Sequence, residues 1–214
     1  MKCSYLIRHS ERIDFAYPNI WKNTKRYQEN HKDPYITKNG ILLVRKAMLK
    51  IINDIKNNDN YVPDYIYSSP FVRCIETSIV ISSIVNSIFK KRPLIRIEYG
   101  LRELYVMPFC YRQLMDKKMT VEWILKRYYK HKHIFDTKYR SIHKFDEMQY
   151  NALNPLTEIN RPLKVIAKLD GIICTHGLNI LSLIRKSKGK LKWFENNKVT
   201  GKSQHSYCAM VKIK

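Results

Sequence analysis

Short apolar runs alternate with longer stretches of helical periodicity along this chain. The runs "KCSYLI", "DYIYSS", "LIRIEYG" and "LDGIICTHG" are rich in β-branched and aromatic residues, which predicts four short buried strands. Apolar residues recur at helical spacing from Val44 to Ile55, and Thr37 is placed to cap that helix. The segment "FVRCIETSIVISSIVNSIF" is apolar on most faces, which predicts a largely buried helix with Pro70 in its first turn.

The order of these elements predicts the fold class. Strands that alternate with helices indicate a three-layer α/β/α domain with a mostly parallel central sheet, formed by residues 1–214 as one unit. "SYCAMVKIK" predicts a closing edge strand, and the irregular, aromatic and basic residues 15–34 predict a loop. Residues 106–165 break the alternation, and Thr120 caps a helix within them. We expect this segment to be a helical insertion over the active-site end of the sheet.

The charge of the chain is strongly basic. Forty Lys and Arg residues against 18 Asp and Glu give a formal net charge of +22, which favours phosphates, acidic proteins or nucleic acid as partners. Biased residue usage is an equal alternative, because much of the excess is lysine accompanied by many Asn and Ile. The five cysteines are odd in number and form no C-x-x-C pair, which predicts a reduced, cytoplasmic setting. We find no signal pattern and expect no membrane span.

Polar side chains gather where the predicted strands end. The carboxyl ends of parallel strands meet at one edge of a sheet, where ligands bind in such folds. Two histidines, three arginines and one carboxylate follow the four strands at this edge, and packing requires none of them there. These residues are Arg8, His9, Arg12, Arg73, Glu103 and His176.

This combination of residue types suits phosphoryl transfer. The planar guanidinium group of arginine matches phosphate oxygens, and a neutral imidazole can attack phosphorus to form a covalent phosphohistidine. A second, protonated imidazole would stabilise charge on the phosphoryl oxygens, and a carboxylic acid would protonate the leaving oxygen and then activate water. This chemistry requires no metal or cofactor, and no His/Cys/Asp cluster in the sequence suggests one.

Four fragments in order carry a family resemblance. "LIRHSER", "SSPFVRCIET", "GLREL" and "ICTHG" resemble the signatures of the histidine phosphatase superfamily, and "DPYITKNG" is similar to its D-x-x-L-T-x-x-G segment. The resemblance implies the phosphoglycerate-mutase-like fold, with His9 as the nucleophile. It also implies that Arg8, Arg73 and His176 bind the phosphate and that Glu103 donates the proton.

The first fragment points to one branch of that superfamily and also departs from it. With Arg12 and Asp14, "RHSERID" resembles the R-H-G-E-R-x-D form of protein-tyrosine and ecdysteroid-phosphate phosphatases, which adds Arg12 to the phosphate site. Ser10 replaces the usual glycine, so its hydroxyl either gives the pocket another donor or obstructs close approach. Glu11 is a reserve candidate for the acid. We interpret Asp14 as a brace for Arg12 and Thr77 as a packing position.

Three functions remain open from the sequence. The first is a metal-independent phosphomonoesterase acting on a phosphorylated small molecule or a phosphoprotein. The second is a mutase or bisphosphatase, although the residues that mark phosphoglycerate mutases after their R-H-G are missing here. The third is a polyanion-binding or structural protein with little activity. "YYKHKH", with His131 and His133, is better interpreted as a solvated helix end than as a metal or nucleic-acid site. The oligomeric state stays open, with a dimer as one alternative.

Overall fold

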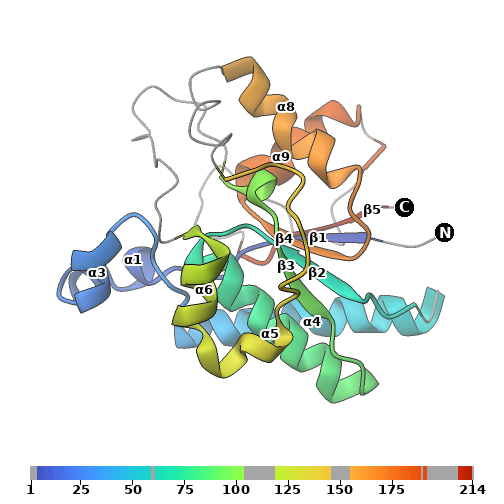
Figure 1. Cartoon of the computed structure of the whole chain (residues 1–214). Coiled ribbons are helices and arrows are strands. Elements are labelled where there is room, and N and C mark those ends of the chain that lie inside the picture. Colours follow the sequence, from blue (N-terminus) through green and yellow to red (C-terminus); the bar gives the residue numbers. More distant parts are fainter. Residues whose placement is uncertain are drawn as a thin grey trace.

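The computed structural model describes residues 4–58, 61–103, 119–145, 155–188, 190–191 and 207–213. Its centre is a five-stranded mixed sheet with the strand order β3-β2-β4-β1-β5 (Figure 1). The strands are β1 (Ser4–Arg8), β2 (Tyr65–Ser68), β3 (Leu94–Ile97), β4 (Ile172–Thr175) and β5 (Met210–Ile213). The first four are parallel, and β5 pairs antiparallel with β1 at one edge, as the sequence predicted.

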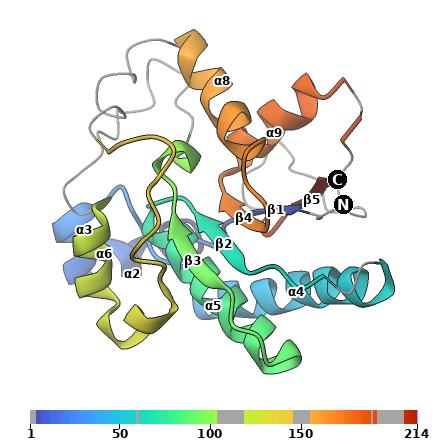
Figure 2. The ribbon, with the colours of Figure 1, turned by 45° about the vertical axis from the view of Figure 1, so that its right-hand side comes forward.

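Helices cover both faces of this sheet. Two of them lie on one face, α4 (Lys38–Asn58) and α5 (Val72–Phe89), and two lie on the other, α8 (Pro155–Ile166) and α9 (Gly177–Lys186) (Figures 1 and 2). Successive strand residues point to opposite faces, so Ile7 packs in the core with α4 and α5 while Leu6 packs with α8 and α9. The prediction of a three-layer α/β fold is therefore confirmed.

Helix α5 is unusually apolar. By length and composition it is the one helix among the described residues that could cross a membrane, with a mean hydropathy of 1.4 over 18 residues. Half of that window is buried inside the fold, as in the core helix of a soluble protein, which passes the same test. The buried half packs with α4 and the sheet. The apolar character of α5 therefore has a structural explanation.

The predicted loop at residues 15–34 is largely helical. It contains α2 (Pro18–Lys22) and α3 (Lys25–Asn30), after α1 (Ile13–Ala16). The side chain of Thr24 caps α3 by accepting a hydrogen bond from the Tyr27 amide at 3.1 Å. These helices are too short to show apolar residues recurring at helical spacing, so the sequence did not predict them. Contacts of the Trp21 ring with Tyr27 and Tyr35 hold them in place.

The segment predicted as an insertion is divided between two layers. Helix α6 (Val121–Arg127) begins after the Thr120 cap, as predicted, and the 3₁₀ helix η3 (Tyr129–Ile134) follows it. Both contribute to the core on the α4–α5 face. Helix α8 instead covers the opposite face, where Val165 and Ile166 are buried. The described parts of residues 106–165 therefore lie on both faces of the sheet. The parts at 106–118 and 146–154 lie outside the described residues, so a cover over the site stays a prediction.

Candidate active site

The two histidines of the predicted site lie side by side at the carboxyl edge of the sheet. β1 and β4 are neighbours in register, with Arg8 opposite Thr175, so His9 and His176 leave the sheet together. Their ring centroids are 5.3 Å apart at an interplanar angle of 64°. The side chains are almost inaccessible, with 1% and 0% exposed. Strand pairing alone therefore places the two imidazoles within reach of one small group.

The hydrogen bonds of His9 define its reactive nitrogen. Nδ1 of His9 is 2.9 Å from the Ser10 carbonyl oxygen. A carbonyl only accepts hydrogen bonds, so Nδ1 carries the proton and Nε2 keeps its lone pair. Burial, followed by the charges of Arg73, Arg8 and Arg12, lowers the pKa of His9 well below 6.5. His9 is therefore a neutral imidazole with an unprotonated Nε2 at neutral pH.

His176 is held by donors and acceptors from α5 and the loop before it. Nη2 of Arg73 lies 3.4 Å from Nδ1 of His176, and the Ser69 hydroxyl lies 2.9 Å from Nε2. A guanidinium group only donates, so Nδ1 accepts and Nε2–H donates to Ser69. Burial and then the charge of Arg73 lower the pKa of His176 well below 6.5. His176 is therefore also neutral in the free protein.

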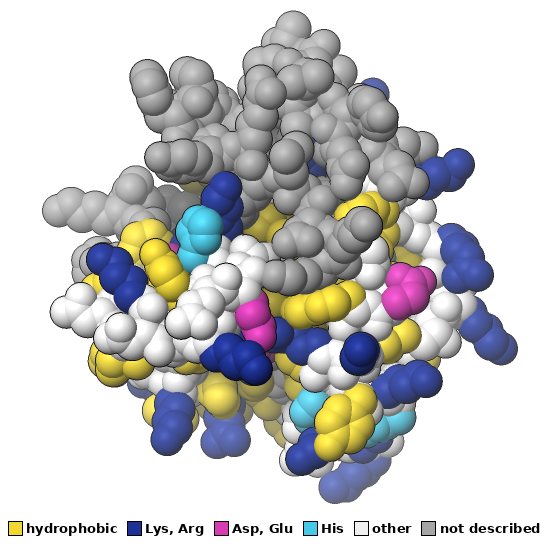
Figure 3. All heavy atoms as spheres, turned by 60° about the vertical axis from the view of Figure 1, so that its left-hand side comes forward, with side chains coloured by type: hydrophobic (Ala, Val, Ile, Leu, Met, Phe, Trp, Pro, Cys, Tyr) yellow, Lys and Arg dark blue, Asp and Glu magenta, His cyan; other side chains and the backbone are white. Residues whose placement is uncertain are grey.

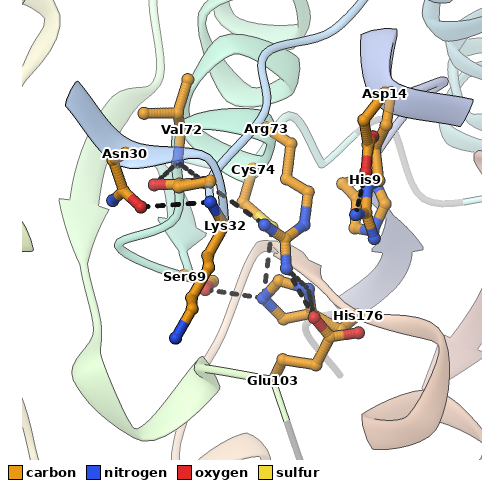
Figure 4. Close-up of polar contacts among 12 residues, drawn as sticks. His9, Asp14, Asn30, Lys32, Ser69, Val72, Arg73, Cys74, Glu103 and His176 are labelled. Carbon is orange, nitrogen blue, oxygen red and sulfur yellow. Dashed lines mark hydrogen bonds and ion pairs between the residues drawn. The ribbon is translucent and has the colours of Figure 1, made fainter. Parts of the chain in front are cut away.

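Arg73 connects the acidic and basic parts of the site. It is 1% exposed and lies in the first turn of α5. Its Nη1 donates to Asp33 at 3.2 Å and its Nη2 donates to Glu103 at 2.5 Å (Figure 4). Oε2 of Glu103 is also 3.7 Å from Nδ1 of His176. Two carboxylates thus fix the guanidinium plane from two sides, and the imidazole of His176 is its third neighbour.

Asp33 is a site residue that the sequence analysis did not identify. Both of its carboxylate oxygens accept from the Val72 amide at 3.0 Å, which places an acceptor at the N-terminus of α5. The helix consequently begins at Val72, and the expectation that Pro70 occupies its first turn was wrong. Burial raises the pKa of Asp33 to about 6. Asp33 therefore positions both the helix start and Arg73.

Two further arginines act on the histidines from the β1 side. Asp14 accepts from Nε and Nη2 of Arg12 at 3.0 and 2.6 Å, which confirms that it braces this arginine. The guanidinium of Arg8 lies over the ring of Tyr207, 4.9 Å from its centroid. That ring is 6.2 Å from the His9 ring. No motif contains Tyr207, so sequence reasoning could not have found it.

The loop that carries Glu103 is fixed by helices α8 and α9. Nδ2 of Asn179 donates to the carbonyls of Leu101 and Arg102 at 3.0 Å. Arg161 donates to the Arg102 carbonyl at 3.2 Å and also to that of Gly100. Neither Asn179 nor Arg161 belongs to a motif singled out in the sequence. Their side chains hold the backbone immediately before Glu103.

Ser10 points away from the histidine pair. Its hydroxyl donates to the Gly40 carbonyl at 2.7 Å, and its amide donates to Thr77 Oγ1 at 3.1 Å. Thr77 also donates to the Arg73 carbonyl at 2.7 Å, so the position predicted for packing also joins the loop after β1 to the start of α5. Glu11 accepts from the Thr37 hydroxyl at 2.5 Å, at the N-terminus of α4. The structure therefore does not place the reserve acid Glu11 with the histidines.

We expect Ser10→Gly to leave kcat/KM for an aryl phosphate within about threefold of the wild type, because the lost hydrogen bond is on the far side of the loop. The free energy of unfolding should fall by about 0.5–1.5 kcal/mol in urea denaturation. Ser10→Ala, which loses the same bond without adding the flexibility of glycine, is the control. A large gain in turnover would show instead that the serine obstructs the pocket.

The two depressed histidine pKa values predict acid sensitivity. The unfolded chain binds protons near pH 6.5 and the folded site does not, so stability is present above this pH and is lost as pH falls below it. For each histidine, the free energy of unfolding should fall by up to about 1.4 kcal/mol for each pH unit below 6.5. Urea denaturation of wild type and His9→Asn between pH 7 and 5 isolates the contribution of His9 to this loss. The raised pKa of Asp33 changes the stability in the opposite direction. Asp33 is present in both proteins, so its contribution cancels in the difference between them. Parallel stability curves would contradict this prediction.

No group of three or more His, Cys, Asp or Glu among the described residues is arranged to hold a metal ion. His131 and His133 are exposed on η3, in line with their interpretation as a solvated segment. Cys74, Cys174 and Cys208 are buried, and no disulfide bond joins them in the part of the chain that the structure describes. The described site is thus built from imidazole, guanidinium and carboxylate groups.

The fold and site together define an α/β protein with buried histidine and arginine side chains clustered at the carboxyl edge of its sheet. No family model and no curated protein matches the sequence. Among solved structures, the ecdysone phosphate phosphatase of Bombix mori in complex with tungstate superimposes with a TM-score of 0.56 and 16% identity, covering 100% of this chain and 89% of that one.

Two further solved structures are similar at lower TM-scores. Phosphoglycerate mutase from Bacillus anthracis has a TM-score of 0.47 and 16% identity, covering 100% of this chain and 88% of that one. Phosphoserine phosphatase from Entamoeba histolytica has a TM-score of 0.40 and 18% identity, covering 86% and 78%. These structures belong to the histidine phosphatase superfamily. The superposition on the Bombix mori phosphatase shows that the chain has the phosphoglycerate-mutase-like α/β fold that its motifs predicted.

Proposed function

We propose that the protein is a phosphomonoesterase that forms a phosphohistidine on His9. The observation that carries the proposal is a neutral imidazole with its Nε2 unprotonated, facing a second imidazole at 5.3 Å and surrounded by three arginines. A nucleophile that is already deprotonated needs no general base. Arginine charges that lower the pKa of both histidines are the charges that attract a phosphate dianion.

In the first step, Nε2 of His9 attacks phosphorus while the bond from phosphorus to the ester oxygen breaks. Glu103 takes up a proton from solvent when it leaves Arg73 and then, as the carboxylic acid, gives this proton to the leaving oxygen. In the free protein Glu103 is bound to Arg73, so a phosphate that takes Nη2 of Arg73 releases Glu103 toward the leaving group. Asp33 keeps Nη1 of Arg73 in place during this exchange.

In the second step, the Glu103 carboxylate removes a proton from water as the water oxygen attacks phosphorus. The bond from phosphorus to Nε2 breaks, which returns neutral His9 and releases inorganic phosphate. His176 lies beside Arg73, where a bound phosphate dianion favours its protonated form. The charged imidazole then stabilises the phosphoryl oxygens.

The deciding test is turnover of p-nitrophenyl phosphate by the full chain in the presence of EDTA. We expect turnover that vanadate inhibits and a phosphoenzyme that is stable to alkali and labile to acid, as a phosphoramidate bond should be. Tandem mass spectrometry should place the phosphate on His9. Absence of turnover, or a phosphate trapped on another residue, would overturn the proposal.

The role of Glu103 predicts a dependence on the leaving group. Glu103→Gln cannot donate a proton, so kcat for an alkyl phosphate should fall by about 10²–10⁴-fold. For p-nitrophenyl phosphate, whose leaving group needs little protonation, the fall should be much smaller. Glu122→Gln, an exposed glutamate on α6, is the matched control. Equal losses for both substrates would assign the proton transfer to another group.

The surroundings of the pocket support an anionic substrate, either a phosphorylated small molecule or a phosphoprotein. Lys32 extends from the Asp33 loop past Ser69 toward the side where Glu103 lies (Figure 4). Figure 3 shows Lys and Arg side chains spread over one face of the molecule with few acidic ones among them. This excess of positive charge raises the local concentration of anions and is screened by salt. A substrate with a second anionic group should therefore have the lower KM at low ionic strength.

A further inference from the structure

A second hollow lies on the outer side of α5, between α4 and η3. Its volume is about 290 Å³, and it is lined by side chains from all three helices and from the segment after α5. Arg73 lies in the first turn of α5, whereas the hollow is lined by α5 residues 79–86. Ten residues separate Arg73 from Ser83, which is about 15 Å along a helix axis. The hollow is therefore distinct from the histidine pocket.

The rim of this hollow is cationic. Arg45 comes from α4, Arg92 from the segment after α5, and His131 and His133 from η3, while no Asp or Glu among the described residues lines it. Arg45 and Arg92 are exposed and form no ion pair with any residue in the described ranges. Arg26, on the surface near the start of α5, pairs with Glu76 at 3.4 Å. Two guanidinium groups at one concave site without a carboxylate raise its positive potential.

The wall of the hollow is apolar. Ile79, Val80 and Ile84 of α5 line it, and each is only partly buried. This is the outer face of the most apolar helix in the described structure, so water contacts hydrocarbon here unless a ligand covers it. An apolar wall beneath a cationic rim matches a molecule with a charged head and an apolar body. The volume is at the lower end for ligand pockets, which favours a small molecule over a macromolecule.

We propose that this hollow, lined by Arg45, Arg92 and the outer face of α5, is a second binding site for a small organic anion. The ligand class has one oxyanion head, phosphate or carboxylate, on an apolar body. The guanidinium groups of Arg45 and Arg92 bind the head, because their planar donors match two oxygens of such a group. Ile79 and Val80 contact the body.

The test is titration of the full chain with 1-naphthalenesulfonate, an oxyanion on an apolar body that has no phosphate ester to hydrolyse. We expect saturable binding by calorimetry, and in ¹H–¹⁵N NMR spectra the largest amide shifts at residues 79–86 and 131–134. Inorganic sulfate and neutral 1-naphthol, which carry only the head or only the body, should each bind at least about tenfold more weakly, the loss of one favourable contact. The measurement needs no turnover, so it is independent of the proposed phosphatase activity.

Two double variants separate the site from the general charge of the protein. Arg45→Gln/Arg92→Gln should weaken naphthalenesulfonate binding by about tenfold or more. Lys46→Gln/Lys126→Gln removes the same charge from exposed positions on α4 and α6 that do not line the hollow. This variant should change the affinity for naphthalenesulfonate by less than about twofold. The proposal is overturned by equal losses in both variants, by shifts confined to the His9–His176 pocket, or by failure to saturate. The affinities of naphthyl phosphate and naphthoate for the His9→Asn protein show whether the site prefers a phosphate or a carboxylate head.

Discussion

His9→Ala should lower kcat/KM for p-nitrophenyl phosphate by on the order of 10³-fold or more and abolish the trapped phosphoenzyme. The substitution removes Nε2 of His9, the unprotonated nitrogen that makes the attack in the proposed mechanism. Arg8, Arg73 and His176 remain, so the variant should still bind phosphate or vanadate. Steady-state assays and isothermal titration of vanadate measure the two effects separately.

His131→Ala is the matched control for this experiment, because it removes an exposed histidine far from the pocket on η3. It should keep full activity. The urea midpoint of His9→Ala must be measured as well, since alanine leaves a cavity at a buried site. A folded His9→Ala protein with wild-type turnover would exclude His9 as the nucleophile.

Arg73→Lys should lower kcat/KM by about 10²–10³-fold, although it keeps the positive charge. Arg73 reaches Asp33, Glu103 and His176 at 3.2, 2.5 and 3.4 Å through two separate nitrogens of one rigid plane. A lysine ammonium group is a single point and cannot hold Asp33 while it binds a phosphate oxygen. KM and kcat should both change, because the substituted side chain no longer releases Glu103 when phosphate binds.

Two comparisons make the Arg73 prediction specific. Arg73→Met leaves the buried Asp33 without its charge partner and should cost about 3–5 kcal/mol of stability, so it tests folding rather than catalysis. Arg26→Lys alters an arginine whose side chain is 44% exposed and pairs with Glu76, and should change stability by less than about 1 kcal/mol. If Arg73→Lys and Arg26→Lys had equal activity, the guanidinium geometry at position 73 would have no role in the reaction.

Asp33 illustrates why part of the site was not predictable. The fragment that contains it was noted for its resemblance to a family segment, but it lies 40 residues from Arg73 and in a stretch interpreted as a loop. Only the packing of the segment after α3 against the start of α5 brings the carboxylate to the Val72 amide. The same holds for Asn179, whose side chain bonds to a carbonyl 77 residues away. Local sequence patterns do not predict contacts between residues so far apart in the chain.

The direction of the Ser10 side chain was also decided by tertiary structure. The sequence allowed its hydroxyl to serve the pocket or to obstruct it. The acceptor that it uses is a backbone carbonyl at Gly40, 30 residues away in the first turns of α4. A backbone group has no sequence signature, so the outcome depended on how α4 lies against the loop after β1.

The sequence by itself determined the order of the strands and of the long helices α4 and α5, because apolar residues repeat there at the period of each element. It also determined which six residues meet, since the carboxyl ends of parallel strands share one edge of a sheet. Tertiary structure decided the protonated nitrogen of each histidine, the carboxylates that fix Arg73, and the division of residues 106–165 between two layers. These features depend on contacts between segments far apart in the chain, where burial and hydrogen-bond geometry, and not local periodicity, set the free energy.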